Sequence, residues 1–283
     1  NSDNEIIKWF GTATDIQDQK MHEVRLEELV KQRTLELKRS NEDLQQFAHV
    51  ASHDLKEPLR KISTFSERLG LEFSDVLSEK GKMYLQKLQA SSKRMTDMIN
   101  SILNYSVINA TEQTNDAVDL NFVLDGITND LELVIMQKEA KISYQWLPGE
   151  KGASTLIYQL FYNLVYNARK FSKIDIPPTI TISAGKLPAS ELSGMVDITN
   201  AGSYHYIRVE DNGIGFNQEH ADRIFHIFSR LNGQDKYEGT GLGLALCRKI
   251  VHRHQGVIYA TGEEGLGSCF HILLPINDES GKV

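Results

Sequence analysis

The chain has 283 residues and a formal net charge of −7 at pH 7, with 24% charged residues. This acidic balance argues against a nucleic-acid-binding surface, and no run approaches the ~18 apolar residues of a membrane span. The two cysteines, Cys247 and Cys269, cannot build a disulfide framework and lie in apolar contexts, so we expect reduced core thiols.

The first segment, residues 1–15, is rich in apolar residues between Ile6 and Phe10. This segment resembles the closing strand of a PAS sensor domain. We therefore expect the remnant of such a domain here, and an isolated edge strand or a tag is the alternative.

A long helix is predicted from about Asp18 to about Phe73. Its apolar residues fit heptad positions over much of its length: Leu26, Val30, Leu37, Leu44, Phe47 and Ala51. Arg33 and Ser40 weaken this seam. We interpret residues 16–47 as a coiled-coil signalling helix.

The most informative part of this helix surrounds His53. Apolar residues recur there every four positions: Phe47, Ala51, Leu55 and Leu59. His53 lies about 200° from both Ala51 and Leu55 on a helical projection, so we expect it to face away from the apolar stripe. Asp54 can orient its imidazole ring, and Pro58 predicts a bend one turn later. This pattern favours a catalytic nucleophile, although an isolated histidine is more often an ordinary surface residue.

A turn at 74–81 and a second amphipathic helix at about 82–108 follow. Two such helices cannot bury their apolar stripes alone, so we expect two hairpins to pair into a four-helix bundle within a homodimer. The predicted dimerisation and phospho-acceptor unit is 40–109, and the polar residues 110–119 read as a linker.

The remainder, 120–276, alternates helices at about 120–140, 154–172 and 241–255 with strands at about 142–147, 179–184, 195–199, 204–211, 257–262 and 268–275. This order predicts a two-layer α/β domain with a mixed sheet covered by helices on one face. The fold class is therefore α plus α/β, and residues 277–283 form a tail.

A polar stripe marks the second helix of this domain. It comprises Gln159, Asn163, Asn167 and Lys170, which fall on one helical face. Amide oxygens coordinate hard cations, and a lysine one turn later can neutralise phosphate. An ordinary solvated face is the alternative interpretation of the stripe.

Three further blocks point to a nucleotide pocket. Asp211 ends a strand with its carboxylate inward, and Gly213 and Gly215 follow, where a tight turn lets backbone approach a ligand. The glycines at 239, 241 and 243 open a helix, which places backbone N–H groups where phosphates bind. A last glycine block precedes Ser268. Each block alone matches an ordinary turn, whereas their order is informative.

These motifs together resemble those of sensor histidine kinases of two-component systems, in particular the PAS-linked, phytochrome-like branch. The block around His53 resembles the phospho-acceptor box, the amide stripe the N box, and Asp211–Gly215 the G1 box. Ile224–Phe228 resembles the F box and Gly239–Gly243 the G2 box. The resemblance covers residues 40–276.

The resemblance implies a cytoplasmic protein-histidine kinase that uses ATP and Mg²⁺ to phosphorylate its own His53, with Asp54 as ring partner. The phosphoryl group then passes to the receiver domain of a response regulator. Implied ATP-binding residues are Asn163, Asn167, Lys170, Asp211, Gly213, Gly215, Phe228, Gly239, Thr240, Gly241, Leu242, Gly243 and Ser268, with Asn167 and Asn163 at the metal. Residues 217–240 are expected to form a mobile lid that Phe225 and Phe228 anchor. Within it, Arg230 and Lys236 are candidates to reach the γ-phosphate.

Two other functions are compatible with parts of the sequence. The first is a hydrolytic ATPase of the gyrase, chaperone and mismatch-repair type, but Asn163 occupies the position where those relatives carry a glutamate base. The second is a catalytically silent dimeric scaffold that relays signals from a sensor, against which the intact His53, Asn167 and Asp211 speak.

Overall fold

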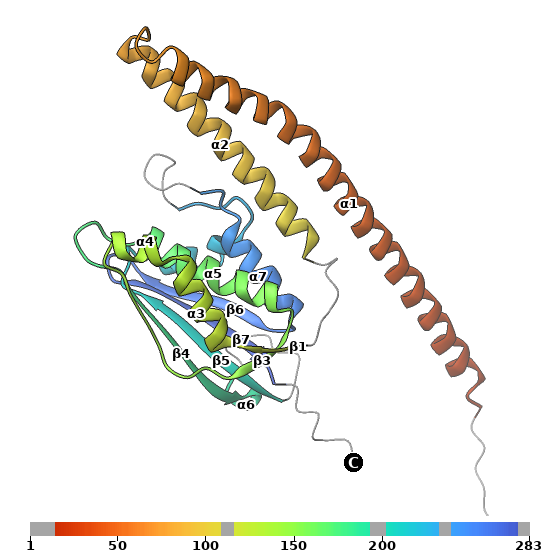
Figure 1. Ribbon diagram of the computed structural model, residues 1–283. Helices are drawn as coiled ribbons and strands as arrows, with labels where there is room; N and C mark the ends of the chain where they lie inside the picture. Colours follow the sequence, from red (N-terminus) through yellow and green to blue (C-terminus); the bar gives the residue numbers. More distant parts are fainter. Residues whose placement is uncertain (1–14, 109–115, 193–201, 232–238, 277–283) are drawn as a thin grey trace, which may run out of the picture. The chain divides into compact units, whose positions relative to one another are not determined.

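The computed structural model describes residues 15–108, 116–192, 202–231 and 239–276 of the chain (Figure 1). The chain divides into two compact units, Asn1–His49 and Val50–Val283. Nearly all of the PAS-like segment, the strand predicted at 195–199, Lys236 and the tail at 277–283 lie outside the described residues.

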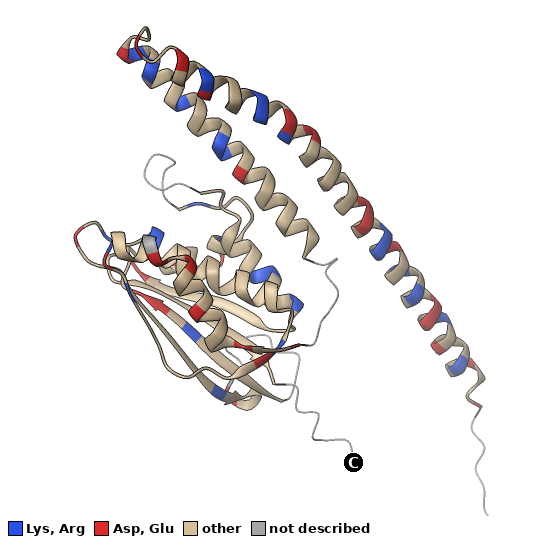
Figure 2. Ribbon diagram, in the orientation of Figure 1, with Lys and Arg blue, Asp and Glu red and all other residues tan. Residues whose placement is uncertain are grey.

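Helix α1 (Gln17–Glu72) begins in the first unit and confirms the predicted long helix. Up to His49 it carries charged residues of both signs (Figure 2), some of them paired, as Arg33 is with Glu36 at 2.9 Å. Exposed pairs of this kind stabilise a helix only slightly. The heptad residues Leu26 and Leu37 are exposed in the single chain, so the coiled coil remains a prediction.

The second unit begins with the rest of α1 and with α2 (Glu79–Val107), which form an antiparallel hairpin. The Ser92 hydroxyl donates to the Leu59 carbonyl at 3.3 Å, and the Gln89 amide donates to the Ser66 carbonyl at 3.0 Å. The helical assignment of α1 continues through Pro58. The bonds from Ser92 to Leu59 and from Gln89 to Ser66 fix the register of the two helices in the hairpin.

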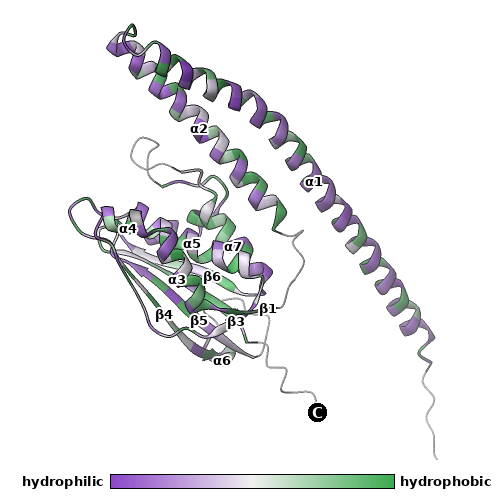
Figure 3. Ribbon diagram, viewed as in Figure 1, coloured by the Kyte–Doolittle hydropathy of each residue, from purple (hydrophilic) through white to green (hydrophobic). Residues whose placement is uncertain are grey.

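Helix α2 begins three residues before the predicted start, because Ser78 caps it. The Ser78 hydroxyl accepts a hydrogen bond from the Gly81 N–H at 3.1 Å, which satisfies one of the free donors of the first turn. Figure 3 shows hydrophobic residues scattered along both helices of the hairpin. Many of them are exposed, including Leu55, Phe65 and Met95, as expected for helices that need a partner surface.

A five-stranded sheet forms the framework of the remaining domain. Its order is β2 (Lys141–Tyr144), β4 (Thr179–Pro188), β5 (Ser203–Asp211), β7 (Gly267–Pro275) and β6 (Val257–Glu263). The β2–β4 pair is parallel and the other pairs are antiparallel, so the predicted mixed sheet is confirmed. Helices α3 (Leu120–Asp130), α5 (Ser154–Lys170) and α7 (Gly243–Arg253) cover one face (Figure 1).

Two predictions about this domain were wrong in detail. The helix predicted at 120–140 is two helices, α3 and α4 (Glu132–Gln137), because the chain leaves the helical conformation at Leu131. Residues 116–119, predicted as linker, form strand β1, which pairs antiparallel with β3 (Gly149–Gly152). The short elements are α6 (Ala189–Leu192), η1 (Gln218–His220) and η2 (Arg223–Phe225).

The core lies between the helices and the sheet. Leu160, Phe161 and Leu164 of α5 are almost fully buried, as are Ile207 of β5 and Ile250 of α7. Their side chains supply most of the driving force for folding, because apolar area removed from water is the main favourable contribution to stability. This burial holds helix α5 at the centre of the domain, with its polar stripe on the side away from these buried residues.

We expect Leu164→Ala to lower the free energy of unfolding by about 2–5 kcal/mol, because it leaves a cavity between α5 and its neighbours. Leu266→Ala is the matched control, since Leu266 is 65% exposed. Denaturant titration followed by circular dichroism measures both effects. Equal stability of the two variants would contradict this account of the core.

Candidate functional site

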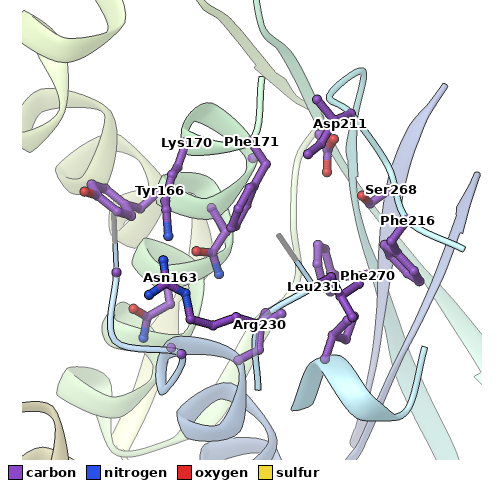
Figure 4. Close-up of a pocket in the computed structure, with 18 of the residues that line it drawn as sticks. Asn163, Tyr166, Lys170, Phe171, Asp211, Phe216, Arg230, Leu231, Ser268 and Phe270 are labelled. Carbon is purple, nitrogen blue, oxygen red and sulfur yellow. The ribbon is translucent and has the colours of Figure 1, made fainter. Parts of the chain in front are cut away.

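A cavity of about 230 Å³ lies between α5, the ends of β5 and β7, and the segments before α7 (Figure 4). Residues from all the downstream sequence blocks meet in it. The candidates that line it are Asn163, Asn167, Lys170, Asp211, Gly215, Gly239, Thr240, Gly241, Gly243 and Ser268. The chain thus brings together residues that are up to 105 positions apart (163 to 268).

Asp211 forms one wall of the cavity, where β5 ends opposite Ser268 of β7. Its Oδ1 accepts a hydrogen bond from the Gly213 N–H at 2.8 Å. Burial raises the pKa of the Asp211 carboxyl to about 6, although hydrogen bonds from Gly213 and Ser268 act in the opposite direction. At neutral pH the carboxylate is therefore a buried acceptor that faces the cavity.

The glycines around Asp211 permit close backbone packing. A Cβ atom on Gly213 would lie 2.6 Å from the Phe171 carbonyl oxygen, and one on Gly267 would lie 2.0 Å from that of Asp211. Gly215 has a φ of 64°, and its Cβ would lie 1.9 Å from the Glu263 carbonyl oxygen. These positions need glycine to assemble the wall itself. The approach of a ligand to the backbone at Gly213 and Gly215 stays a prediction.

The opposite wall contains the polar stripe of α5. A Cβ atom on Gly243 would lie 3.6 Å from Asn163 Oδ1 and 3.8 Å from Asn167 Nδ2, so both amides face the first turn of α7. No side chain caps this helix, whose cap residue is Leu242. The N–H groups of its first turn are therefore suited to an anionic ligand.

Lys170 lies on the same wall, one turn after Asn167. Its Nζ is 2.5 Å from the position that a Cβ atom of Gly239 would take, and 4.5 Å from the centroid of the Phe171 ring. Figure 4 shows Lys170 and Asn163 on one side of the cavity, with Asp211 and Ser268 on the other. The cavity therefore has a cationic and amide end and a carboxylate end.

The two phenylalanines expected to anchor the lid behave differently. Phe225 is buried and meets Phe270 edge to face, with ring centroids 6.3 Å apart. Phe228 is 49% exposed and has a φ of 61°. Its backbone N–H donates to the Gly241 carbonyl at 3.1 Å. Phe228 therefore links the segment 224–228 to the glycine block 239–243 through its backbone.

Three sequence-predicted residues, Gly213, Phe228 and Leu242, do not line the cavity. Several residues that line it were not assigned to it from the sequence: Tyr166, Ala168, Phe171, Ile214, Phe216, Ile224, Ser229, Leu231, Leu244 and Phe270. Most are apolar, and their pattern in the sequence is that of core residues. The available signals were proximity along the chain to predicted site residues and, for Ile224, Ser229 and Leu231, a position within the predicted lid at 217–240. Arg230, a candidate from the sequence, also lines the cavity.

The donor set suits magnesium carried by a ligand. Among the described residues, no three His, Cys, Asp or Glu side chains form a group that could hold a metal ion. The Asn163 and Asn167 side chains lie beside the first turn of α7, and each carries one neutral amide oxygen. Mg²⁺ binds in this way when phosphate oxygens and water complete its coordination, so the residues present fit that ion.

His53 lies in α1, within the second unit. Its side chain is 76% exposed and that of Asp54 is 73% exposed, and Nδ1 of the imidazole lies 3.2 Å from the Asp54 Oδ1. The imidazole is thus exposed and partnered by a carboxylate, as expected from the sequence. When Nδ1 donates to Asp54, the second nitrogen, Nε2, keeps its lone pair toward solvent.

Two protein-family models match the chain. The model described as His Kinase A (phospho-acceptor) domain matches residues 43–111. The model described as Histidine kinase-, DNA gyrase B-, and HSP90-like ATPase matches residues 152–278. Together the two matches cover more than half of the chain.

Curated relatives agree with these matches. Cyanobacterial phytochrome A of Nostoc sp. (strain PCC 7120) is 34% identical over 85% of this chain and 30% of its own length. Phytochrome-like protein Cph1 of Synechocystis sp. (strain PCC 6803) is 33% identical over 86% and 30%. The adaptive-response sensory kinase SasA of Crocosphaera subtropica is 29% identical over 96% and 75%. The chain thus spans about 30% of the length of the two phytochromes.

Solved structures share the fold. Full-length ShkA in complex with AMPPNP has a TM-score of 0.59 and 21% identity, covering 81% of this chain and 45% of that one. The histidine kinase AdeS of Acinetobacter baumannii has a TM-score of 0.51 and 18% identity, covering 80% of this chain and 98% of that one.

None of the helices in the described ranges combines the length and hydrophobicity needed to span a bilayer.

We expect the Asp211 carboxylate to accept a hydrogen bond from the exocyclic amine of adenine. Because the pKa of Asp211 is about 6, adenine-nucleotide affinity should fall about fourfold between pH 7.5 and pH 5.5, as the carboxylate is protonated. Isothermal titration with ADP across this range measures the change. Asp211→Asn should bind more weakly at pH 7.5 and lack this component of the pH dependence, so the variant also corrects for titration of the phosphates. Parallel pH profiles for both proteins would contradict the role of Asp211.

Proposed function

The chain belongs to the family of sensor histidine kinases, and on this premise we propose that it transfers the γ-phosphoryl group of ATP to His53. From His53 the phosphoryl group passes to an aspartate of a response regulator. The observation that supports the proposal is the pairing of an exposed, carboxylate-bonded imidazole with a cavity that has a carboxylate end and an amide and cationic end.

In the proposed reaction the neutral His53 ring attacks the γ-phosphorus through Nε2. The N–P bond forms as the bond between the γ-phosphorus and the bridging oxygen breaks, and ADP leaves with that oxygen. Positive charge develops on the ring, whose Nδ1–H donates to the Asp54 carboxylate at 3.2 Å. Asp54 thereby holds the reactive tautomer and stabilises the charged product.

The cavity supports a matching orientation of ATP. The buried Asp211 carboxylate would accept a hydrogen bond from the exocyclic amine of adenine. Lys170 and the first turn of α7 would bind the phosphates at the other end. The complex of ShkA with AMPPNP is consistent with a nucleotide in this fold.

Magnesium is part of the proposal. Asn167, with Asn163, would hold a Mg²⁺ ion that arrives with the nucleotide, and this ion neutralises charge on the phosphates when bound. The residues of the chain orient the nucleotide independently of that contribution.

Three partners follow from the same proposal. The exposed apolar residues of the helical hairpin support a homodimer in which two hairpins form a four-helix bundle. The receiver domain of a response regulator would accept the phosphoryl group. A PAS-like sensor before α1 would supply the signal through the proposed coiled coil at 16–47. We propose a dimerisation and phospho-acceptor unit at 40–109 and an ATP-binding domain that ends at 276. This domain begins at Asp116 rather than at 120, because β1 pairs with β3.

The alternatives predict different products. A hydrolytic ATPase would release phosphate, but Asn163 is an amide and cannot act as a general base. A silent scaffold would bind nucleotide or partner without forming phosphohistidine. An experiment with γ-labelled ATP distinguishes both alternatives from a kinase, because only a kinase forms labelled phosphohistidine.

We expect the chain to incorporate an acid-labile, base-stable label from γ-labelled ATP and Mg²⁺, and His53→Gln to abolish it. Because His53 and the cavity residues lie on separate elements, the variant should bind ADP with unchanged affinity. His49→Gln, one turn earlier on α1, is the matched control and should retain the label. Acid-labile label that persists on His53→Gln would contradict the assignment of His53 as the phosphorylated residue.

A further inference from the structure

Two buried polar atoms in this cavity lack a hydrogen-bond partner. Among the described residues, Asn163 Nδ2 and Ser229 Oγ are both buried, unpartnered and part of side chains that line the cavity. Buried polar atoms in folded proteins almost always have a partner. The pair therefore indicates groups whose partner is a bound molecule.

Ser229 lies at the amide and cationic end. A Cβ atom on Gly241 would lie 3.1 Å from the Ser229 carbonyl oxygen, which places the serine directly beside the glycine block that opens α7. The Ser229 N–H donates to the His226 carbonyl at 3.1 Å. Together with the bond from Phe228 to Gly241, this turn holds the serine at the edge of the cavity.

We propose that Ser229 is a nucleotide-binding residue whose hydroxyl donates a hydrogen bond to an oxygen of the phosphate chain. The inference rests on the proposed function and extends it. Ser229 is not among the nucleotide-binding residues expected from the sequence.

The chemistry of the neighbours identifies the partner as anionic. Asn163 Nδ2 can only donate, and Lys170 and Arg230 bring positive charge to the same end of the cavity. A hydroxyl can donate or accept, but among donors and cations its favourable role is donation to a shared acceptor. Phosphate oxygens are such acceptors, whereas the adenine end is occupied by Asp211 and Ser268.

The test compares Ser229→Ala with Ser229→Thr, which keeps the hydroxyl, and with Ser143→Ala. The Ser143 hydroxyl pairs with Thr181 Oγ1 at 3.3 Å and lies outside the cavity. Calorimetry with ATP and ADP, and competition with adenosine, measure affinity. Thermal unfolding of the ligand-free proteins measures stability.

We expect Ser229→Ala to weaken ATP and ADP binding roughly tenfold, the size of one hydrogen bond to a charged group. Adenosine affinity should stay unchanged, and Ser229→Thr and Ser143→Ala should bind ATP within about threefold of the unmodified chain. The ligand-free midpoint of Ser229→Ala should be equal or higher, because the variant removes a buried unpaired hydroxyl.

Wild-type ATP affinity in Ser229→Ala overturns the inference and leaves the proposed function intact. Equal losses for adenosine and ATP, or a lowered ligand-free midpoint, also overturn it, since they indicate a structural role. Failure of the unmodified chain to bind ATP would remove the proposed function together with this inference.

Discussion

Burial of the Asp211 carboxylate at the end of β5 is the constraint on which the rest of the cavity depends. A charge removed from water is costly unless hydrogen bonds replace its hydration. The Gly213 N–H provides one such bond within the same turn. Ser268 provides another, and it reaches the carboxylate because β5 and β7 pair with Asp211 opposite Ser268. Gly213 and Gly267 then allow the surrounding backbone to approach closely enough. The acceptor that would select adenine is thus inseparable from the packing of the sheet.

The helices and central strands could be predicted because their patterns are local. The stripe of α5 and the inward position of Asp211 follow from helical and strand periodicity alone. Strands β1 and β3 were missed because their sequences, DAVD and GEKG, contain a single β-branched residue, Val118, and no alternation of apolar and polar residues. The break at Leu131 involves no proline or glycine. The role of Phe228 depends on a left-handed backbone conformation, which its residue type disfavours and no sequence pattern signals.

The helical hairpin and the cavity domain differ in how they use apolar residues. In the cavity domain, residues such as Leu164 are buried within one chain, so this domain has a hydrophobic core of its own. On the hairpin, Leu55 and Phe65 stay exposed although its backbone bonds are satisfied. The same region presents His53 beside Asp54. A surface that is apolar on one side and carries a nucleophile on another is suited to association that leaves the nucleophile accessible.

The two ends of the cavity stand on parts of the fold with different persistence. Asp211 is the last residue of β5 and Ser268 lies at the start of β7, and both strands are paired on both sides within the sheet. Ser229 and Gly241 belong to the connections between β5 and α7, whose described parts, 212–231 and 239–242, contain only the single-turn helices η1 and η2. In amide hydrogen exchange, the first pair should lie near the slowest, globally protected residues, and the second should open through small local fluctuations. The base-recognition wall would thus persist while the phosphate side exchanges its contacts, which lets one end hold a nucleotide as the other rearranges.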